Sequence, residues 1–252
     1  MAHGLAMDQA AWTSPWRTRS VRDKAVLTLG LLLAAVTLPP VPGGVAVASV
    51  SLALLLGPIR VGLTRLWRIS WLPLLSILIG VATVAVSPTW DAGPGLEVTP
   101  AGSAMAAALA VRAVAATLAM FTLACSTPIV DLFAALRRAH VPDPLIEIGS
   151  LIYRFTVGLL ESAAAIHDAQ VARLGYATRS AAMRSASMGV AVLFVRSWDR
   201  ARRLEAGLSG RGYDDRLCTL EPDRVRSGRF LAGSIALLAV LTGTSVAWAV
   251  LR

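Results

Sequence analysis

Arginine is the residue type with the clearest potential for chemistry in this sequence. It is densest in RSWDRARRLEAGLSGRGY (196–213), where Arg196, Arg200 and Arg203 recur at helical spacing. Residues spaced by three and four share one face of a helix, so this face would carry three guanidinium groups. A guanidinium binds carboxylates or phosphates through a planar fork of donors. The stretch therefore predicts a surface that binds acidic groups.

The same stretch ends in Gly210-Arg211-Gly212. Glycine adopts the left-handed conformation with which many helices end, so we expect a helix to finish here. Arg211 would then lie at a helix terminus between two residues that have no side chains. That shape suits insertion into a groove.

Several other chemistries find no residues to support them. The only lysine is Lys24 and no GxxxxGK[ST] motif occurs, so the chain cannot hydrolyse ATP through a P-loop. His3, His140 and His167 are scattered, without acids or cysteines at ligand spacing. We therefore expect no catalytic residue, no metal site and no cofactor in this chain.

The composition indicates an integral membrane protein. Of 252 residues, 56% are hydrophobic and 15% are charged, whereas soluble domains average about 25% charged residues. Three apolar stretches are long enough to span a bilayer, and two shorter ones either extend through neighbouring prolines or form a re-entrant hairpin. The long stretches are 71–86, 105–125 and 230–251, and the short ones are 25–38 and 45–59.

Basic residues predict the orientation of these spans. The loops 39–44 and 87–104 contain no lysine or arginine, whereas 127–229 contains fifteen arginines. The positive-inside rule then places the N-terminus in the cytoplasm of a multi-pass protein of the cell membrane. We predict an all-α integral membrane protein with about five transmembrane helices and a cytoplasmic helical domain inserted before the last span. Its parts are a cytoplasmic lead (1–24), spans one to four (25–126), the helical insert (127–228) and the last span (229–252).

Within the insert, proline and capping residues predict three helices. Thr127-Pro128 begins the first, and Asp143-Pro144 begins a second that runs to about Arg173. The third covers roughly 187–209. Asp131 of the first helix would face water. The second helix would carry an apolar stripe and, on another side, a solvated charged stripe. The apolar stripe is Leu145, Ile148, Ile152, Phe155, Leu159 and Ile166, and the charged stripe is Glu147, Arg154, Glu161 and Asp168. An apolar face of the third would pack on a neighbouring helix through Phe194, Trp198 and Leu208.

Arg112 is the one charged residue inside a long apolar stretch. A mid-bilayer arginine costs about 2.5–3.5 kcal/mol on insertion scales, and no span contains an acid to pair with it. It either snorkels or reaches a water-filled crevice, or it faces a polar group of a partner protein. The alanine-rich residues around it suit close helix packing in lipid.

From residue 12 onward the chain resembles the transmembrane (T) components of energy-coupling factor ABC transporters, in particular the cobalt-type CbiQ permeases. The resemblance is carried by several motifs in their order. These are SPWRTRSVRDKAVLTLGLLLAAVTLPPVP (14–42), LAVRAVAA (109–116), STPIVDLFAALRRAHVPDPLIEIGSLIYRF (126–155), AQVARLGY (169–176) and FVRSWDRARRLEAGLSGRGY (194–213).

The resemblance implies a non-catalytic permease subunit with separate partners. A cytoplasmic ABC ATPase dimer would bind and hydrolyse ATP with Mg²⁺, and a small membrane subunit, with a possible accessory membrane subunit, would capture the substrate. The helical insert would supply coupling helices whose arginine motifs dock on the ATPases. The resemblance implies Ala172, Arg173, Leu174, Gly210, Arg211 and Gly212 as those motifs. Beside them we assign Arg196, Arg200 and Arg203 to ATPase binding, and Arg112, Phe194, Trp198 and Leu208 to the capture-subunit interface or to packing.

The favoured cargo on this resemblance is Co²⁺, with nickel or a vitamin as alternatives. A membrane-bound enzyme is a more distant alternative, since no polar catalytic cluster is evident. Nucleic acid is not expected as a partner, because eleven acids accompany the arginines of the insert and stacking aromatic residues are few.

Overall fold

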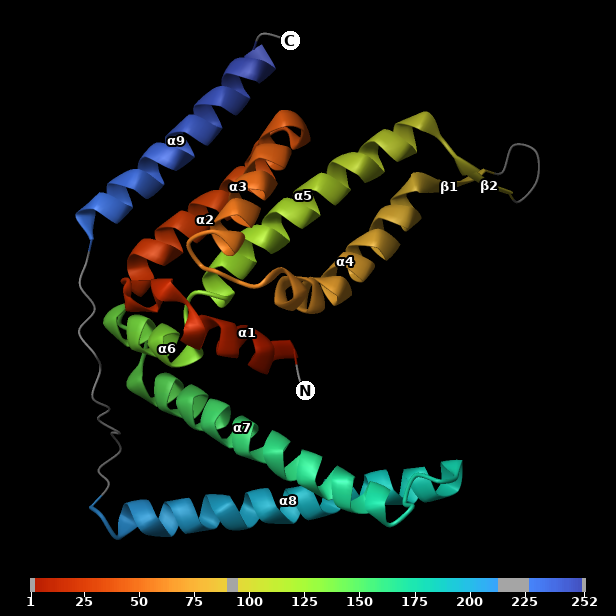
Figure 1. Ribbon diagram of the computed structural model, residues 1–252, viewed down its shortest axis with the longest axis vertical. Helices are drawn as coiled ribbons and strands as arrows, with labels where there is room; N and C mark the ends of the chain where they lie inside the picture. The colour runs from red at the N-terminus through yellow and green to blue at the C-terminus, as the bar shows by residue number, and fades with distance from the viewer. Residues whose placement is uncertain (1–2, 90–94, 213–226, 251–252) are drawn as a thin grey trace. The chain divides into compact units, whose positions relative to one another are not determined.

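The computed structural model describes residues 3–89, 95–212 and 227–250, and most of them are helical (Figure 1). The chain divides into two compact units. The first unit comprises Met1–Leu132 and Pro222–Arg252, and the second unit comprises Phe133–Glu221. Each unit is described by itself.

The first unit is a helical bundle built around α5 (Pro100–Ala124). Its other helices are α1 (His3–Thr13), η1 (Pro15–Thr18), α2 (Val21–Thr37), α3 (Val45–Leu56), α4 (Leu63–Ala85) and α9 (Gly228–Val250). Local signals set several of these boundaries. Thr99 caps α5 by accepting a hydrogen bond from the amide of Gly102, and Pro100 takes the first helical position.

The core of the first unit forms where α2, α3 and α4 pack on α5 (Figure 1). Ala115 and Ala119 of α5 are fully buried, beside Leu31 and Leu55. Small side chains let helix backbones approach closely, which is how helices associate in lipid. The expectation that the alanine-rich helix is a packing surface is confirmed.

Three helices of the described residues are long and apolar enough to cross a membrane: α4, α5 and α9. They correspond to the three long apolar stretches of the sequence. The two shorter stretches form α2 and α3, with 17 and 12 residues. The turn η2 (Pro40–Gly44) joins them, and Gly43 and Gly44 lie too close to neighbouring side chains for a Cβ atom. Five membrane crossings stay a prediction.

A short antiparallel pair departs from the all-helical expectation. Strand β1 (Val86–Thr89) continues from α4, and β2 (Gly95–Val98) leads toward α5, with Val86 opposite Val98. The sequence between the two long apolar stretches was expected to be loop. Apart from this pair, the all-α class is confirmed for the described residues.

The second unit contains most of α6 (Ile129–Arg138), which begins in the first unit, and the antiparallel helices α7 (Asp143–Ala172) and α8 (Arg179–Ser209). The bounds of α7 match the expected second helix. The third helix begins eight residues earlier than expected. Thr178 caps its start by accepting a hydrogen bond from the amide of Ala181. The serines and glycine that follow are weak helix formers, and their packing on α7 overrides that propensity.

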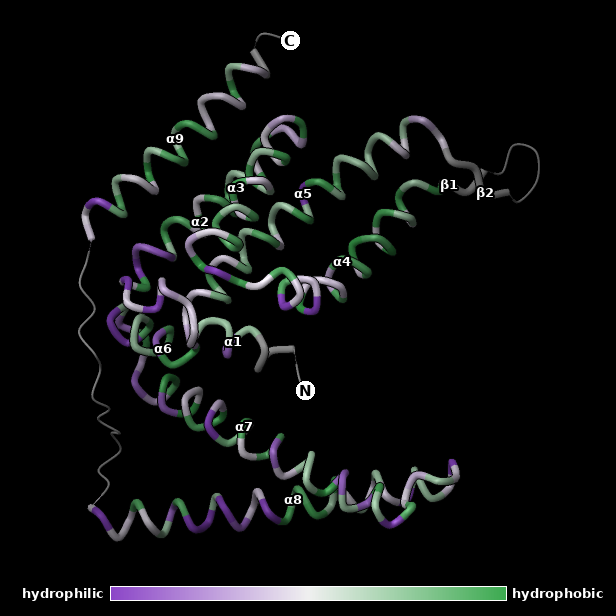
Figure 2. The backbone as a smooth tube through the Cα atoms, viewed as in Figure 1, coloured by the Kyte–Doolittle hydropathy of each residue, from purple (hydrophilic) through white to green (hydrophobic). Residues whose placement is uncertain are grey.

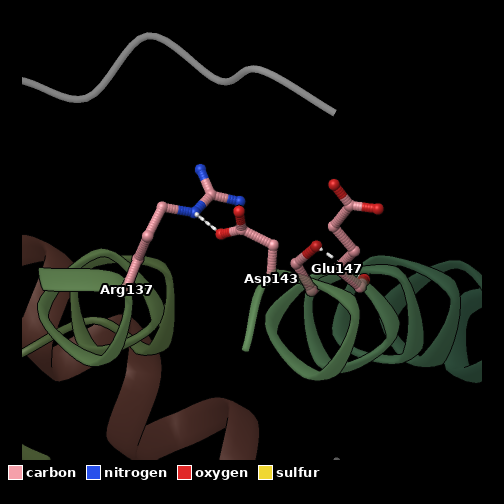
Figure 3. A network of polar contacts seen from close by, with 4 residues as sticks. Arg137, Asp143 and Glu147 are labelled. Carbon is pink, nitrogen blue, oxygen red and sulfur yellow. Dashed lines mark hydrogen bonds and ion pairs between the residues drawn. The ribbon is translucent and has the colours of Figure 1, made fainter. Parts of the chain in front are cut away.

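An ion pair fixes the corner between α6 and α7. The Arg137 guanidinium lies 3.2 Å from the Asp143 carboxylate, joining the last turn of α6 to the first turn of α7 (Figure 3). Phe133 packs so closely on Gly149 that a Cβ atom there would collide with its ring. The corner is therefore held by both charge and shape.

The expected stripes of the second helix are only partly correct. Of the apolar stripe, Leu145, Ile148 and Ile152 are exposed, and Ile146 is buried in their place. Of the charged residues expected in water, Glu147 and Asp131 are buried. These side chains near the α6–α7 corner follow tertiary packing, which helical periodicity alone does not include.

Candidate functional site

The turn after α7 presents the first arginine motif. Ala172 is the last helical residue and Arg173 forms the C-cap. The amide of Gly175 donates to the carbonyl of Gln170 at 2.8 Å, which closes the turn. Leu174 adopts a positive φ of 56°, a conformation unfavourable for a leucine. Arg173 and Leu174 are both exposed, so the turn projects a cation and an apolar side chain together.

A small polar network holds this turn in place. The Gln170 side chain donates to the carbonyl of Ser185 and accepts from the Tyr176 hydroxyl, both at 2.8 Å. The Ser185 hydroxyl donates to the carbonyl of Gly175, also at 2.8 Å. A Cβ at Gly175 would lie 2.6 Å from that hydroxyl oxygen. Sequence reasoning missed Gln170, Tyr176 and Ser185 because their pairing crosses from α7 to α8.

The second arginine motif lies at the opposite end of α8. Gly210 is the C-cap, and the amide of Arg211 donates to the carbonyl of Leu208 at 3.0 Å. Gly212 has a φ of 68°, so glycine is needed there to turn the chain. The predicted end of the helix at Gly210 is confirmed. Arg211 is exposed.

The length of α8 separates the two motifs. Its 31 residues correspond to about 45 Å at the standard helical rise. Arg173 lies in the turn before α8, and Arg211 follows its last residue. Since no ion pair to either arginine is present among the described residues, both guanidinium groups are available. The arrangement can serve two separate acidic grooves, and it cannot close around one small ligand.

Of Arg196, Arg200 and Arg203 on α8, one packs against α7 differently from the other two. The guanidinium of Arg200 lies 5.7 Å from the centre of the Phe155 ring and fills the space above Gly158. All three arginines are exposed, but among the described residues no ring lies under the guanidinium of Arg196 or Arg203. Arg200, Arg203 and Arg154 together line a cavity of about 370 Å³ between α7 and α8. Sequence reasoning placed Arg154 on the solvated stripe of the second helix and did not bring it together with the arginines of α8.

The expected packing of Phe194 and Trp198 on a neighbouring helix is wrong. Phe194 is 65% exposed and Trp198 is 55% exposed, and the two rings stack on each other. Gly189 is the residue of α8 that is buried instead, and it faces Gln170 and Ile166 of α7; Leu193 and Ser197 are half-buried. A residue without a side chain lets α8 approach α7 closely. Leu208 is half-buried. Contact between these rings and a capture subunit stays a prediction.

Arg112 has a partner that sequence reasoning did not consider. Its guanidinium lies 3.5 Å from the carbonyl oxygen of Leu38, the C-cap of α2. The carbonyl end of a helix carries partial negative charge, which favours a cation. The carbonyl is followed by Pro39 and so lies at a helix end that needs a donor. Within the chain, sequence reasoning looked only for an acidic side chain as the partner of Arg112, whereas a backbone carbonyl supplies the contact.

The N-terminal lead makes further contacts that the sequence did not reveal. The Lys24 ammonium is almost fully buried and donates to the carbonyl of Ser126, just after α5, at 2.9 Å. The Asp23 carboxylate accepts from the amide of Ser227 before α9. The Asp8 carboxylate accepts from the amide of Ile129 at the start of α6. These residues join the ends of helices that are far apart in the sequence.

No metal-binding group appears in the part of the chain that the structure describes: no three His, Cys, Asp or Glu side chains lie together there. The features that stand out are two exposed arginine turns on one hairpin. They can bind acidic surfaces, and they offer no nucleophile, general base or metal ligand set.

Comparisons with known proteins agree on one family. A family model described as CbiQ, cobalt transport protein, matches residues 13–220. A cobalt transport protein CbiQ from Rhodobacter capsulatus is 42% identical over 239 residues, covering 94% of this chain and 93% of the relative. The CbiQ protein of Salmonella typhimurium is 30% identical and covers 82% and 96%. A putative fused cobalt transport protein CbiMQ from Methanocorpusculum labreanum is 28% identical over 82% of this chain and 36% of its own length.

Proposed function

This chain belongs to the CbiQ family of cobalt transport proteins, and from that premise we propose that it is the transmembrane coupling subunit of an ATP-driven cobalt importer. In this proposal it is a permease subunit without catalytic activity. An ABC ATPase dimer in the cytoplasm binds the helices of the second unit. A separate membrane subunit captures Co²⁺. Nickel or a vitamin is the alternative cargo.

The observation that supports this proposal best is the pair of exposed arginine turns about 45 Å apart along α8. Two ATPases of one dimer offer two equivalent sockets, and each turn would occupy one of them. Because the helix between the turns is stiff, it would transmit a movement of one ATPase to the turn that is bound to the other ATPase. The fused CbiMQ relative supports association with a second membrane component, since its name joins two transport proteins in one chain.

A double substitution tests the proposed contact with the ATPases. We expect Arg173→Ala with Arg211→Ala to abolish co-purification of the ATPases in mild detergent and uptake of labelled cobalt. Truncating one partner of a buried charge pair typically costs about 2–5 kcal/mol, which is enough to dissociate a complex. Arg184→Ala is the matched control, because Arg184 is exposed on the same helix between the two turns.

Orientation and cargo need their own measurements. Cysteines placed at 173 and 211 should react with a membrane-impermeant maleimide only after the cytoplasmic face is opened. If cobalt is the cargo, cells should take up labelled cobalt, and an excess of unlabelled nickel should reduce that uptake only slightly. Undiminished transport by the double variant would contradict the coupling role, whatever the cargo.

A further inference from the structure

A cavity lies in the first unit where α2, α3 and the start of α9 come together. It has a volume of about 500 Å³, within the range of about 300–1,000 Å³ that is usual for small-molecule sites. Its lining is both charged and apolar. The two charged residues are Arg19 and Arg229, and the aliphatic part of the lining is Leu27, Leu54 and Leu237.

The two arginines lie at the same end of a pair of parallel helices. The amide of Ser227, just before α9, donates to the carboxylate of Asp23 in the first turn of α2. Further along, Gly30 of α2 lies against the side chain of Leu238 of α9. The two helices therefore run in the same direction with their starts level. One arginine of the lining precedes α2 and the other is in the first turn of α9.

Aromatic rings hold the guanidinium of Arg19 at this end of the cavity. It lies 4.6 Å from the centre of the Phe230 ring and 5.9 Å from that of Trp16, and the two rings pack edge to face. An aromatic ring attracts the positive charge, but it offers no oxygen to accept hydrogen bonds. Arg229 is the neighbour of Phe230 in the chain, so both guanidinium groups flank one ring.

The two cations have no anion of their own among the described residues. Neither guanidinium forms an ion pair or a hydrogen bond there, and no acid lines the cavity. Asp23 is bonded to the backbone beside the cavity, yet it is buried and forms no ion pair with either arginine. An anion that enters the cavity would therefore meet two groups whose forked donors suit a phosphate.

The remainder of the cavity extends along an apolar helix. From Gly228 to Trp248, α9 is long and apolar enough to cross a membrane, so Arg229 lies at the boundary of that segment. Leu237 follows Arg229 by eight residues, which is about 12 Å along the helix. Figure 2 shows the hydrophilic start of α9 giving way to a hydrophobic remainder. Arginine beside aromatic residues, followed by aliphatic ones, matches the change from lipid headgroups to acyl chains.

We infer that this cavity binds one anionic phospholipid. Its phosphate binds Arg19 and Arg229, and an acyl chain extends past Leu27 and Leu54 toward Leu237. A free inorganic anion would leave the apolar lining without a partner. An apolar face of another protein's helix would leave both guanidinium groups without an anion. The inference does not depend on the ATPases or on which cargo is transported.

Binding of defined lipids to the full-length chain tests the inference. The purified, delipidated chain is titrated in detergent with phosphatidylglycerol or phosphatidylcholine of identical acyl chains, and bound lipid is counted by native mass spectrometry. Phosphatidylglycerol should bind more tightly, because the choline group of the other lipid offsets the phosphate charge. Arg19→Gln with Arg229→Gln should weaken phosphatidylglycerol binding about tenfold to thirtyfold and leave phosphatidylcholine binding nearly unchanged.

The matched control removes two arginines elsewhere. Arg65→Gln with Arg68→Gln deletes the same charge from exposed positions of α4 that do not line the cavity, and it should leave both affinities unchanged. Equal affinity of the parent chain for the two lipids would overturn the inference. Full phosphatidylglycerol binding by the Arg19 and Arg229 double variant, or an equal loss in the control, would also overturn it.

A second variant tests the apolar part of the cavity without touching a charge. Gly233 lines the cavity, and a Cβ there would meet nothing within 4 Å, so Gly233→Phe should fill the space without a clash. It should weaken binding of both lipids. Gly243→Phe, on the same helix outside the lining and equally unobstructed, is its control and should change neither. Equal lipid binding by the two phenylalanine variants, with melting temperatures like that of the parent, would contradict the proposed site.

Discussion

The two units of this chain are both helical and both rich in apolar side chains, yet they bury those side chains differently. The hydrophobic core cluster lies entirely within the first unit, where α2, α3 and α4 enclose α5. In the second unit the described helices bury few residues: Ile146 and Glu147 of α7 and Gly189 of α8. Large apolar side chains such as Met183, Val190 and Phe194 remain exposed there.

This difference indicates two kinds of stability. In the first unit, Lys24, Asp23 and Asp8 form hydrogen bonds with backbone groups at the ends of helices. Contacts within the chain therefore fix the arrangement of these helices. The second unit is a long hairpin fixed chiefly at its two turns. Contiguous exposed apolar surface usually marks a site of interaction with protein or membrane. We therefore expect substitutions in the first unit to affect folding, and substitutions in the second to affect association.

The largest expected effect on stability comes from Lys24→Met. The substitution removes a buried ammonium that donates to the carbonyl of Ser126. A hydrogen bond to a charged group contributes about 1.5–3 kcal/mol, so the melting temperature in detergent should fall by about 5–10 °C. Arg22→Met is the matched control, because Arg22 is exposed two residues earlier. Equal melting temperatures for the two variants would remove the proposed role of Lys24.

A smaller but clear loss is expected from Gly30→Val. A Cβ at Gly30 would collide with the Leu238 side chain, which would have to leave its present position between α2 and α9 or push the two helices apart. Overpacking of this kind costs about 1–3 kcal/mol. Gly243→Val of α9 has nothing within 4 Å and should be tolerated. Thermal unfolding of both variants distinguishes tight helix packing from a general intolerance of valine.

Gln170→Leu should act locally in the second unit. It removes the hydrogen bonds to Ser185 and Tyr176 that hold the turn after α7. At about 0.5–1.5 kcal/mol for each bond, amide hydrogen exchange should accelerate between residues 173 and 185, with the melting temperature of the chain little changed. Asp168→Asn, on an exposed site of the same helix, serves as the control. Uniform destabilisation would show that the units do not behave independently.

The smallest effect on folding is expected from Phe194→Ser and Trp198→Ser. Both side chains are exposed in the chain alone, and surface substitutions usually stay within about 0.5 kcal/mol of the parent. If a partner subunit covers them, co-purification of that subunit should decrease while the melting temperature does not. Leu31→Ser, in the fully buried core, should show the reverse pattern.

Local signals in the sequence located several helix ends, but not the starts of α5 and α8. Asp143-Pro144 and Gly210 mark helix ends through capping and backbone restrictions, which depend on a few neighbouring residues. The cap at Thr99-Pro100 has the same form, but residues 87–104 were expected to be a loop. The lengths of the apolar stretches in α4, α5 and α9 were enough to predict three helices that could cross a membrane, because length and composition can be read from the sequence. The turn with Arg211 was found from its flanking glycines and the turn with Arg173 from motif resemblance, and the structure shows both arginines exposed at helix ends.

Only the tertiary structure decided which side chains meet. Lys24 and Ser126 are 102 residues apart, and Gln170 and Ser185 are on different helices. Arg112 contacts a backbone carbonyl, which every residue type carries and which the sequence therefore does not distinguish. Phe194 and Trp198 look like core residues by periodicity, yet α8 turns its small residues toward α7. Helical periodicity shows which face of a helix is apolar. Which face is buried depends on how closely the neighbouring helix can approach.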